Sequence, residues 1–525
     1  MRIITNICLF IACAVVAATA TADPQYQIYD VGVVQVGDSA SQGFGVSTGG
    51  IPVGRSFRTG GTQAFTWTLG GGIVGLPNLS GRSYCVSNSA NDTGTVVGTG
   101  STTAFGSGRL PVVWLSGVVS QLPLPIGETL GDANQVNASG VAVGSADAGI
   151  SQRGVIYSGG SASIITQTTP TGSYFLTAFG INDSGRVVGQ GIDPNNAARN
   201  VGIVYDIGNS AAFEVGALSG FNGALAFAVS NTGYVVGSSM LNQGSGLPFI
   251  WSDAGGIVPI PLASGTSQGS ARAVNSAGWV VGNDSSAFSI PFLYDGTTTY
   301  RLADIIPAGS GWDLSMNTSS SALGISDNGV IVGTGVHNGA THAYAMIPTL
   351  QVASAVSRKS HGGAGVFDIP LPLSGNPGVE CRIGGANGDY TLVFTFSNGV
   401  VSGNASVSGG SGTVSGVPVF SGKTMTVNLT SVTNAQTLTV TLSNITDVFS
   451  QTLPSTSVSV SILIGDTTGN GIVNASDVGQ TKAPIGQSVN GSNFRTDVNA
   501  NGAINGTDVT LVKSHIGESV SSPSK

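Results

Sequence analysis

The strongest pattern along the chain is a phrase of apolar, polar and glycine positions that recurs over residues 26–348. Its clearest copy covers residues 178–189, with the sequence Ala-Phe-Gly-Ile-Asn-Asp-Ser-Gly-Arg-Val-Val-Gly. An Asn-x-x-Gly group between two apolar runs predicts a hairpin turn, in which the glycine takes a positive φ. The glycine that closes the phrase recurs every 44 to 51 residues, at Gly54, Gly98, Gly144, Gly189, Gly237, Gly282 and Gly333. The pattern therefore predicts seven structural units of similar size.

Each unit continues with an apolar and aromatic strand, such as residues 64–67 or 248–251, and most add one further short apolar run. Four short strands in a unit of this length predict a propeller blade. We therefore predict a seven-bladed β-propeller over residues 23–349. The Val-Val-Gly run of each unit suits a strand buried near the propeller axis.

The two ends of the repeat region complement each other. The last unit stops near residue 348 without its final strand, and the region begins with an unmatched apolar run at residues 29–34. Pairing the two would close the ring and remove two open sheet edges. We predict that residues 29–34 pair with the strand near residues 344–347.

Residues 350–464 have a different pattern, in which apolar and polar positions alternate at 391–396, 424–429 and 437–442. Alternation of this kind predicts sheets with one buried face, and we expect an antiparallel β-sandwich. Residues 356–364 look like the linker from the propeller. The charged side chains of this region are expected to form ion pairs on a loop: Asp368, Glu380, Arg382 and Asp389.

Two matching twelve-residue loops follow, at residues 466–477 and 497–508. Each places oxygen-bearing side chains at positions 1, 3, 5, 9 and 12, and a glycine at position 6. This is the spacing of an EF-hand calcium loop, in which position 7 contributes a backbone carbonyl. Apolar and lysine residues recur at equal offsets after both loops, which predicts a helix leaving each one. The alternative is a pair of Gly- and Asn-rich turns that bind nothing.

Residues 465–520 resemble a type I dockerin, a duplicated half EF-hand that holds two calcium ions and docks into a cohesin domain, often in polysaccharide-degrading complexes. The resemblance implies metal ligands at Asp466, Thr468, Asn470, Ile472, Asn474, Asp477, Asp497, Asn499, Asn501, Ala503, Asn505 and Asp508. Ile472 and Ala503 would give carbonyl oxygens, and Asn474 and Asn505 would act through water. It also implies partner-binding residues at Ala475, Ser476, Lys482, Gly506, Thr507 and Lys513. Thr468 and Asn470 depart from the stronger acidic ligands of the family.

The repeats resemble the HAF-type extracellular repeat family, named for a His-Ala-Phe strand motif. Residues 342–344, His-Ala-Tyr, nearly preserve that motif, and Ala64-Phe65 keeps part of it. This resemblance implies a secreted propeller and supplies no catalytic residues.

The N-terminus predicts secretion. Arg2, an apolar run at residues 7–16 and small residues before Asp23 form a signal peptide over residues 1–22, and residues 521–525 form a polar tail. We expect an extracellular or cell-surface protein with no membrane span. The formal net charge of −8 argues against nucleic acid as a partner. Cys85 and Cys381 are expected to be buried free thiols.

Candidate catalytic residues are few. The chain has only four glutamates and four histidines, and His337, His342, His361 and His515 show no metal-ligand spacing. Ser47 lies in a Gly-x-Ser-x-Gly sequence that the hairpin of the first unit explains. We therefore favour a non-catalytic modular protein, with a carbohydrate as one candidate ligand. Two alternatives remain open: a propeller glycoside hydrolase or polysaccharide lyase carrying a dockerin, and a terminal calcium module that serves only for stability.

Overall fold

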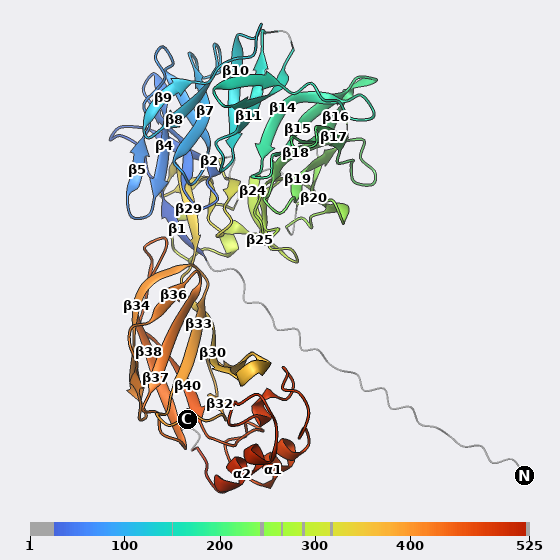
Figure 1. Cartoon of the computed structure of the whole chain (residues 1–525). Coiled ribbons are helices and arrows are strands. Elements are labelled where there is room, and N and C mark those ends of the chain that lie inside the picture. Colours follow the sequence, from blue (N-terminus) through green and yellow to red (C-terminus); the bar gives the residue numbers. More distant parts are fainter. Residues whose placement is uncertain are drawn as a thin grey trace, which may run out of the picture.

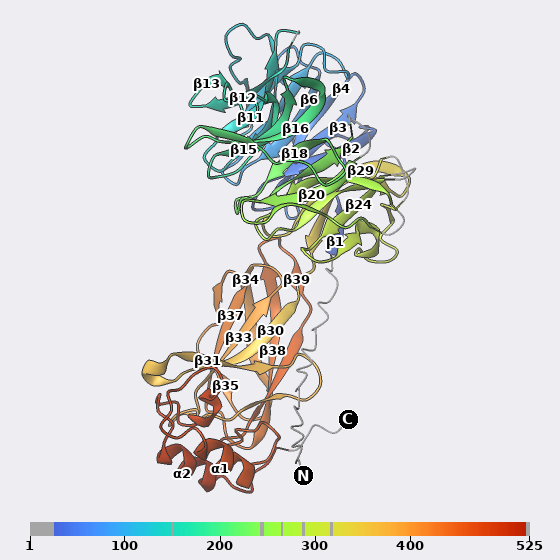
Figure 2. The ribbon, with the colours of Figure 1, turned by 90° about the vertical axis from the view of Figure 1, so that its right-hand side faces the viewer.

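The computed structural model describes residues 26–149, 151–241, 246–263, 266–285, 289–315 and 319–520. The predicted signal peptide and polar tail lie outside these residues. Three parts follow one another along the long axis of the molecule, namely the repeat region, a middle region of strands and a C-terminal module with two helices (Figures 1 and 2). No helix among the described residues is long and apolar enough to cross a membrane.

The repeat region is built from antiparallel meanders of successive strands. The first strands are β2 (Ala40–Val46), β6 (Tyr84–Ala90), β10 (Leu130–Val136), β14 (Tyr174–Ile181), β18 (Gly223–Val229), β22 (Gln268–Val274) and β27 (Ser321–Ile325). The second strands, which begin with the Val-Val-Gly group or just before it, are β3 (Pro52–Arg58), β7 (Thr95–Ser101), β11 (Ala142–Asp147), β15 (Arg186–Asp193), β19 (Val235–Met240), β23 (Val280–Ser285) and β28 (Ile331–His337).

The third strands carry the aromatic residues seen in the sequence, and they are β4 (Gly61–Thr68), β8 (Leu110–Leu115), β12 (Arg153–Ser158), β16 (Asn196–Asp206), β20 (Gly246–Ser252), β24 (Ser289–Tyr294) and β29 (Ala340–Pro348). The outer strands are β5 (Gly72–Gly75), β9 (Val118–Gln121), β13 (Ser161–Ile164), β17 (Ala211–Glu214), β21 (Gly256–Pro259) and β25 (Thr299–Arg301). A short 3-10 helix, η1 (Leu302–Asp304), and strand β26 (Trp312–Asp313) precede β27.

The N-terminal strand β1 (Tyr26–Asp30) closes this region, because it pairs antiparallel with β29 in a register that runs from Tyr26 opposite Pro348 to Asp30 opposite Tyr344. The predicted closure is therefore confirmed. The strand differs from the expected residues 29–34, since it begins earlier and ends at Asp30.

The Val-Val-Gly strand is buried, as expected, and the structure places it second from the centre. The first strand of each meander lies nearest the centre and lines the central cavity, and the Val-Val-Gly strand is second. The Val-Val-Gly strand is apolar because it packs between neighbouring sheets, where Val187 and Val188 are fully buried in two different clusters. The glycine of this strand is needed because the first strand lies very close to it: a Cβ at Gly189 would collide with the carbonyl oxygen of Thr177.

The middle region contains two sheets that share one hydrophobic core. One contains β31 (Val366–Leu371), β30 (Val352–Ser360), β33 (Tyr390–Phe396), β37 (Thr424–Thr430), β35 (Thr413–Val414) and β36 (Val419–Ser421). The other contains β32 (Gly378–Glu380), β40 (Thr456–Ile462), β38 (Gln436–Asp447), β34 (Val400–Gly409) and β39 (Thr452–Leu453). Phe394 and Val427 of the first sheet belong to the same core cluster as Leu438 and Val460 of the second.

Two expectations for the middle region need correction. Residues 356–364 are not a linker, because they form most of β30 and the 3-10 helix η2 (Gly362–Ala364), and β30 pairs with strands on both sides. The adjacent charged residues Arg358 and Lys359 suggested a solvent-exposed segment, whereas Ala355 and Ser357 of the same strand are buried. The pairing is also not purely antiparallel, because β32 runs parallel to β40.

The C-terminal module contains α1 (Ala475–Lys482), the 3-10 helix η3 (Phe494–Thr496) and α2 (Gly506–Ser514). As expected, one helix leaves each loop. The core of the module includes Val473, Val498 and Val512, and it extends to Val379 and Leu463 of the middle region. The module is therefore packed against its neighbour and shares a core with it.

Candidate functional site

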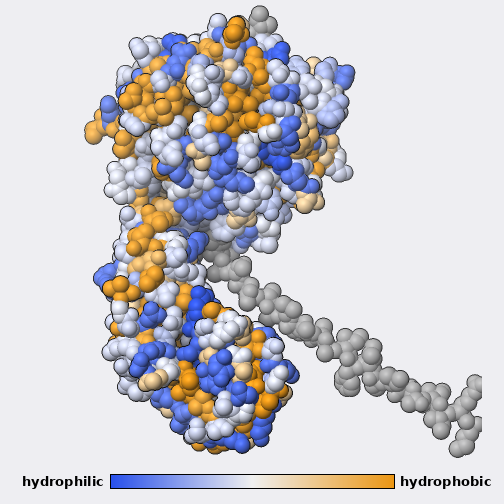
Figure 3. Space-filling view, viewed as in Figure 1, coloured by the Kyte–Doolittle hydropathy of each residue, from blue (hydrophilic) through white to orange (hydrophobic). Residues whose placement is uncertain are grey.

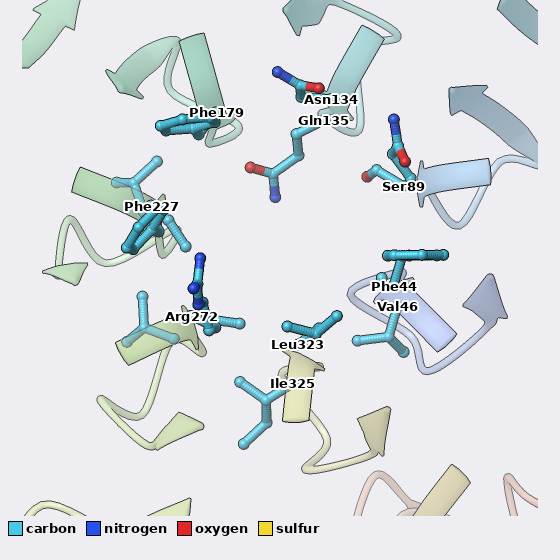
Figure 4. Close-up of a pocket in the computed structure, with 17 residues that line it drawn as sticks. Phe44, Val46, Ser89, Asn134, Gln135, Phe179, Phe227, Arg272, Leu323 and Ile325 are labelled. Atoms are coloured by element: carbon cyan, nitrogen blue, oxygen red, sulfur yellow. The ribbon is translucent and has the colours of Figure 1, made fainter. Parts of the chain in front are cut away.

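A central cavity of about 310 Å³ lies where the first strands of the repeat region converge (Figure 4). Each first strand contains a β-bulge, seen as a register shift against the second strand. The bulged residues all line the cavity: Phe44, Asn88, Asn134, Phe179, Phe227, Arg272 and Leu323. A bulge re-aims a side chain at the cost of one ladder pair. The repeated bulge thus gives each unit one variable residue at the centre.

The sequence reading missed this ring, although a signal for it exists. Each bulged residue stands three positions before the Asn or Ser of the hairpin turn. All but Asn134, which Gln135 follows, lie between two small residues, as Phe179 does between Ala178 and Gly180. The type of the bulged residue changes from unit to unit, among Phe, Asn, Arg and Leu. None of the described residues that line the cavity is Asp, Glu or His.

Arg272 brings positive charge to this cavity. Its guanidinium lies 4.3 Å from the ring centre of Phe227, and its Nε is buried without a hydrogen-bond partner among the described residues. Burial lowers the pKa of Arg272. Gln135 also points toward the centre (Figure 4), and its Oε1 accepts the N–H of Ile181 at 2.9 Å.

The turns between first and second strands join neighbouring units. Asn182 caps its own turn through Oδ1, which accepts the N–H of Arg186, and its Nδ2 donates to the carbonyl of Ser230 in the next unit. Asp183 and Asp327 line a smaller cavity of about 70 Å³ at this end. Asp183 accepts the N–H of Ala138, and Asp327 accepts that of Ser276, both from adjacent units. These two carboxylates therefore help to hold adjacent units together.

The structure brings together Asp30, His337 and His342, which sequence spacing did not reveal. His337 Nδ1 lies 3.0 Å from Asp30 Oδ2, and His342 Nδ1 lies 2.9 Å from the same oxygen. Burial raises the pKa of Asp30, but hydrogen bonds from His342, Gly32 and His337 outweigh it, and the net pKa is lowered. Asp30 is 312 residues from His342 in sequence, and only the pairing of β1 with β29 makes them neighbours.

In the first C-terminal loop, the residues at positions 1, 3 and 12 meet. Asp466 and Asp477 are fully buried, and Thr468 Oγ1 lies 3.1 Å from Asp466 Oδ1 and 2.9 Å from Asp477 Oδ1. Asp466 also accepts the N–H groups of Gly469 and Gly471, at 2.8 and 2.7 Å. The loop backbone thus holds two carboxylates around one point, which is what a divalent oxygen-ligated cation needs.

The second loop repeats this arrangement. Asp497 and Asp508 are fully buried; Asp497 accepts the N–H of Gly502 at 2.9 Å, and Asp508 accepts that of Asn499 at 3.2 Å. Burial, with a further contribution from the negative charge of Asp497, raises the pKa of Asp508. Two buried like charges in one loop favour a cation between them.

The asparagines at position 9 also begin the helices. Asn474 accepts the N–H of Ser476 at 2.7 Å while Asp477 accepts the N–H of Asn474 at 2.9 Å, which makes a capping box. Asn505 and Asp508 do the same for α2. The other predicted ligands lie in the same loops, and three of them accept a loop N–H through Oδ1: Asn470, Asn499 and Asn501. Ile472 and Ala503 occupy position 7 of their loops.

All six predicted partner-binding residues are exposed: Ala475, Ser476, Lys482, Gly506, Thr507 and Lys513. Ile485 and Ile516, which trail the helices, are also exposed. Figure 3 shows apolar patches between polar residues on the surface of this end of the molecule.

Residues 464–517 match the family of the dockerin type I domain. The C-terminal module is a type I dockerin module. The match covers about a tenth of the chain, so it describes this module alone. Domains of this family bind calcium and dock cohesins on scaffolds, which agrees with the two loops and the exposed helix starts.

Solved structures resemble the repeat region at low identity. A catalytically inactive virginiamycin B lyase from Staphylococcus aureus, crystallised with quinupristin, is 10% identical with a TM-score of 0.40, and the match covers 62% of this chain and 99% of that one. The β-propeller domain of the Trilobed protease from Pyrococcus furiosus is 12% identical with a TM-score of 0.31, covering 61% and 91%. These neighbours are propeller-like, and at such TM-scores they carry no argument about activity. No curated protein sequence matches this chain.

The second loop of the dockerin module is held by the middle region. His361 Nδ1 contacts Asp497 Oδ2, and His361 Nε2 contacts Arg382 Nη1 at 3.1 Å. Arginine only donates, so Nε2 accepts, and Nδ1 carries the proton that is donated to Asp497. Arg382 is fully buried and pairs with the fully buried Glu380. Of the four charged residues expected to pair on a loop, Glu380 and Arg382 pair with each other, but in the core. Asp368 pairs at the surface with Arg358 instead, and Asp389 forms no ion pair among the described residues.

Cys85 and Cys381 are free and buried, as expected. Burial raises the pKa of Cys381 to about 11, so its thiol stays protonated and unreactive at neutral pH.

Proposed function

We propose that this protein is a secreted modular binding protein whose calcium-loaded dockerin module docks a cohesin-like or cell-surface partner, with the repeat region as its ligand-binding face. We place it in a polysaccharide-degrading system, with a carbohydrate as the ligand. The observation that carries the proposal is the duplicated loop of the dockerin module. Each copy gathers buried carboxylates at positions 1 and 12 and leaves the start of its helix exposed.

The proposed domains are a signal peptide at 1–22, a seven-bladed propeller at 23–349, a β-sandwich at 350–464, the dockerin module at 465–520 and a polar tail at 521–525. Seven meanders around one cavity support the propeller, and two sheets sharing a core support the sandwich. The propeller then displays a ligand at one end of the molecule, and the dockerin module anchors the other end (Figure 1).

We propose two calcium ions, one in each loop, held by the twelve ligands expected from the sequence. Each loop has only two carboxylates, with Thr or Asn at position 3 and Asn at position 5. Fewer charged ligands weaken such a loop, and extracellular modules bind calcium with a Kd of about 10⁻⁴ to 10⁻³ M. We expect affinities toward that range, which suffice where calcium is abundant.

Exposure favours docking over a purely stabilising role. A module that served only as a calcium clamp would have no need for two exposed copies of the same helix start. Ser476 and Thr507 occupy the same place after their loops, and both are exposed. Small polar residues at exposed, repeated positions suit contact with a partner protein.

The enzyme alternative requires a reactive pair in the cavity. A glycoside hydrolase uses two carboxyl groups that flank the scissile bond. The described residues lining the central cavity supply none, while Asp183 and Asp327 at the turn end are held by backbone N–H groups of neighbouring units. This chemistry favours binding over cleavage.

The test measures binding of the mature chain to a panel of type I cohesin domains by surface plasmon resonance, in calcium and in chelator. We expect binding in calcium only, and its loss when Ser476→Asp and Thr507→Asp are combined. Ser402→Asp, at an exposed position of β34, is the matched control and should bind normally. Binding that persists in chelator or in the double variant, or no binding to any cohesin, contradicts the docking proposal.

A further inference from the structure

We propose that the central cavity binds an acidic saccharide, whose carboxylate is recognised by the guanidinium of Arg272. This inference rests on the proposed role of the repeat region as a ligand-binding face, and it names the class of ligand. It starts from the ring of bulged residues, where Arg272 contributes the only charge.

The charge of Arg272 lacks a partner in the described structure. Its Nε is buried and unpaired, and its flat face rests on Phe227. Several buried or half-buried arginines of the chain pair with Asp or Glu, as Arg109, Arg186, Arg199 and Arg382 do. Arg58, like Arg272, has a buried Nε without a partner among the described residues, but of the two only Arg272 lines the central cavity. A guanidinium presents a planar fork that fits a carboxylate with two parallel hydrogen bonds. In a cavity without acidic residues, the missing carboxylate would come from the ligand.

The rest of the ring suits a sugar. Phe44, Phe179 and Phe227 offer ring faces on which the apolar C–H side of a pyranose can pack. Phe179 and Phe227 lie 5.5 Å apart between ring centres, so they form one continuous apolar wall.

The amides of the ring complement hydroxyl groups. The Oε1 of Gln135 accepts the N–H of Ile181, so its side-chain NH2 group can donate hydrogen bonds to a ligand. Asn88 and Asn134 donate through Nδ2 to the carbonyls of Ala133 and Ala178, which leaves their Oδ1 atoms as acceptors. Sugar hydroxyls both donate and accept, and they can use both kinds of group. An acidic peptide would use the charge of Arg272 but not this combination of amides and ring faces.

The test compares digalacturonic acid with its dimethyl ester, which has almost the same shape and no charge, by calorimetry on the mature chain in calcium. We expect the acid to bind at least tenfold more tightly than the ester. Arg272→Gln should remove this preference, and Arg272→Lys should restore it only in part because a lysine lacks the planar fork. The control is Arg153→Gln, an exposed arginine that stacks on Tyr174 and forms no ion pair among the described residues; it should leave binding unchanged.

Equal affinity for acid and ester, no binding of either, or an equal loss in the Arg153 variant would overturn the proposal. So would stronger binding of polyglutamate, which would identify an acidic peptide as the ligand. Cohesin binding by the same variants keeps the two proposals apart. If cohesins fail to bind while the acid still does, the docking proposal fails and this one stands.

The geometry also points, independently, to a divalent transition-metal site at Asp30, His337 and His342. Their ligand atoms all lie within 4.8 Å of one another. Zinc bonds of about 2.0–2.1 Å in a tetrahedron place neighbouring ligand atoms roughly 3.3 Å apart, close to the separations seen here. Two imidazoles and one carboxylate suit zinc or cobalt, while calcium prefers oxygen ligands.

The surroundings already orient these ligands. His337 stacks on Trp312 with ring centres 4.6 Å apart, and Asn338 Nδ2 lies 3.1 Å from His337 Nε2. Gly32 donates its N–H to Asp30 Oδ1 at 2.8 Å. If His337 binds the metal through Nδ1, its Nε2 carries the proton. That N–H can donate a hydrogen bond to the amide oxygen of Asn338 once the amide group is flipped.

The test adds Co²⁺ and Zn²⁺ to tag-free mature chain in excess calcium. We expect one equivalent of Co²⁺ with visible absorption bands, and a Zn²⁺-dependent rise in melting temperature. His342→Gln should lose both effects, and the control His515→Gln should keep them. The absence of bands, or metal binding that survives His342→Gln, would overturn this site and leave the cluster as a hydrogen-bonded His–Asp group.

Discussion

His361 Nδ1 lies 2.9 Å from Asp497 Oδ2, and both side chains are completely buried. His361 belongs to the middle region, and Asp497 is the first of the ligands proposed for calcium in the second loop of the dockerin module. The backbone adds to this contact, because Ile383 donates its N–H to the carbonyl of Val498. Both regions therefore contribute to the surroundings of the proposed second calcium site.

We predict that His361→Ala weakens one of the two calcium-binding events. Groups that orient a metal ligand without touching the metal typically contribute about 10- to 100-fold to its affinity. Calorimetry on the mature chain should show one unchanged site and one weakened site. Arg358→Ala, at a surface position of strand β30, which ends just before His361, is the control. Two unchanged sites would show that the contact with Asp497 has no part in calcium binding.

Asp284 should make the repeat region less stable as pH rises. Its side chain is fully buried, and burial raises its pKa to about 6, although Ala263 and Thr266 donate hydrogen bonds to it. A raised acid pKa contributes stability below the unfolded value near 4, and this contribution is lost as pH rises through about 6. The free energy of unfolding of Asp284→Asn should equal that of the parent near pH 4 and exceed it by about 2 kcal/mol at pH 8.

Thermal unfolding at both pH values, at fixed calcium concentration, checks this. Asp304→Asn, at an exposed position of η1, is the control and should show the parent behaviour. If the difference in stability between Asp284→Asn and the parent is the same at pH 4 and pH 8, the raised pKa of Asp284 does not affect folding.

Removal of residues 23–38 should destabilise the repeat region. Strand β1 covers the open edge of β29 over five residue pairs, and its loss would leave that edge free to pair with another molecule. We expect a melting temperature lower by several degrees, together with aggregation seen by light scattering. Unchanged melting and solubility would mean that the seam contributes little.

The mature chain should release no reducing sugar from common polysaccharides. The central cavity offers an arginine, amides and phenylalanines among its described lining residues, and an acid–base pair is missing from that set. Reducing-sugar assays at several pH values test this. Reproducible cleavage that disappears with Asp183→Asn or Asp327→Asn would support the enzyme alternative instead.

The sequence predicted those features that depend on local spacing. The dockerin module was recognised because the oxygen-bearing side chains and the turn glycine of each loop lie within twelve residues of each other. The units were recognised from the turn motif and from the closing glycine, whose space is limited by the first strand, as at Gly189. Strand β1 was recognised because an orphan run at one end matched a missing strand at the other.

Features that depend on the path of the chain were not predicted. Asp30 and His342 are neighbours only because β1 pairs with β29, and no local sequence motif predicts that they lie close together. Arg272 reaches the cavity because a bulge turns it inward, and bulges leave little trace in one copy of a repeat. Strand β30 was mistaken for a linker because of its adjacent charged residues Arg358 and Lys359, although Ala355 and Ser357 of the strand are buried.

The closure of the repeat region by β1 has a consequence for folding. Asp30 and Tyr344 pair across more than three hundred residues, and closing a flexible loop of that length costs roughly 5 kcal/mol of entropy. The cost falls when the intervening units are already stacked, because they hold the two ends near each other. We therefore expect β1, the N-terminal strand of the region, to pair with β29 only after the other units have formed. An open array of repeats can lose its units one at a time, but here a unit that loosens anywhere in the ring also loosens the seam, so the region should unfold as a whole.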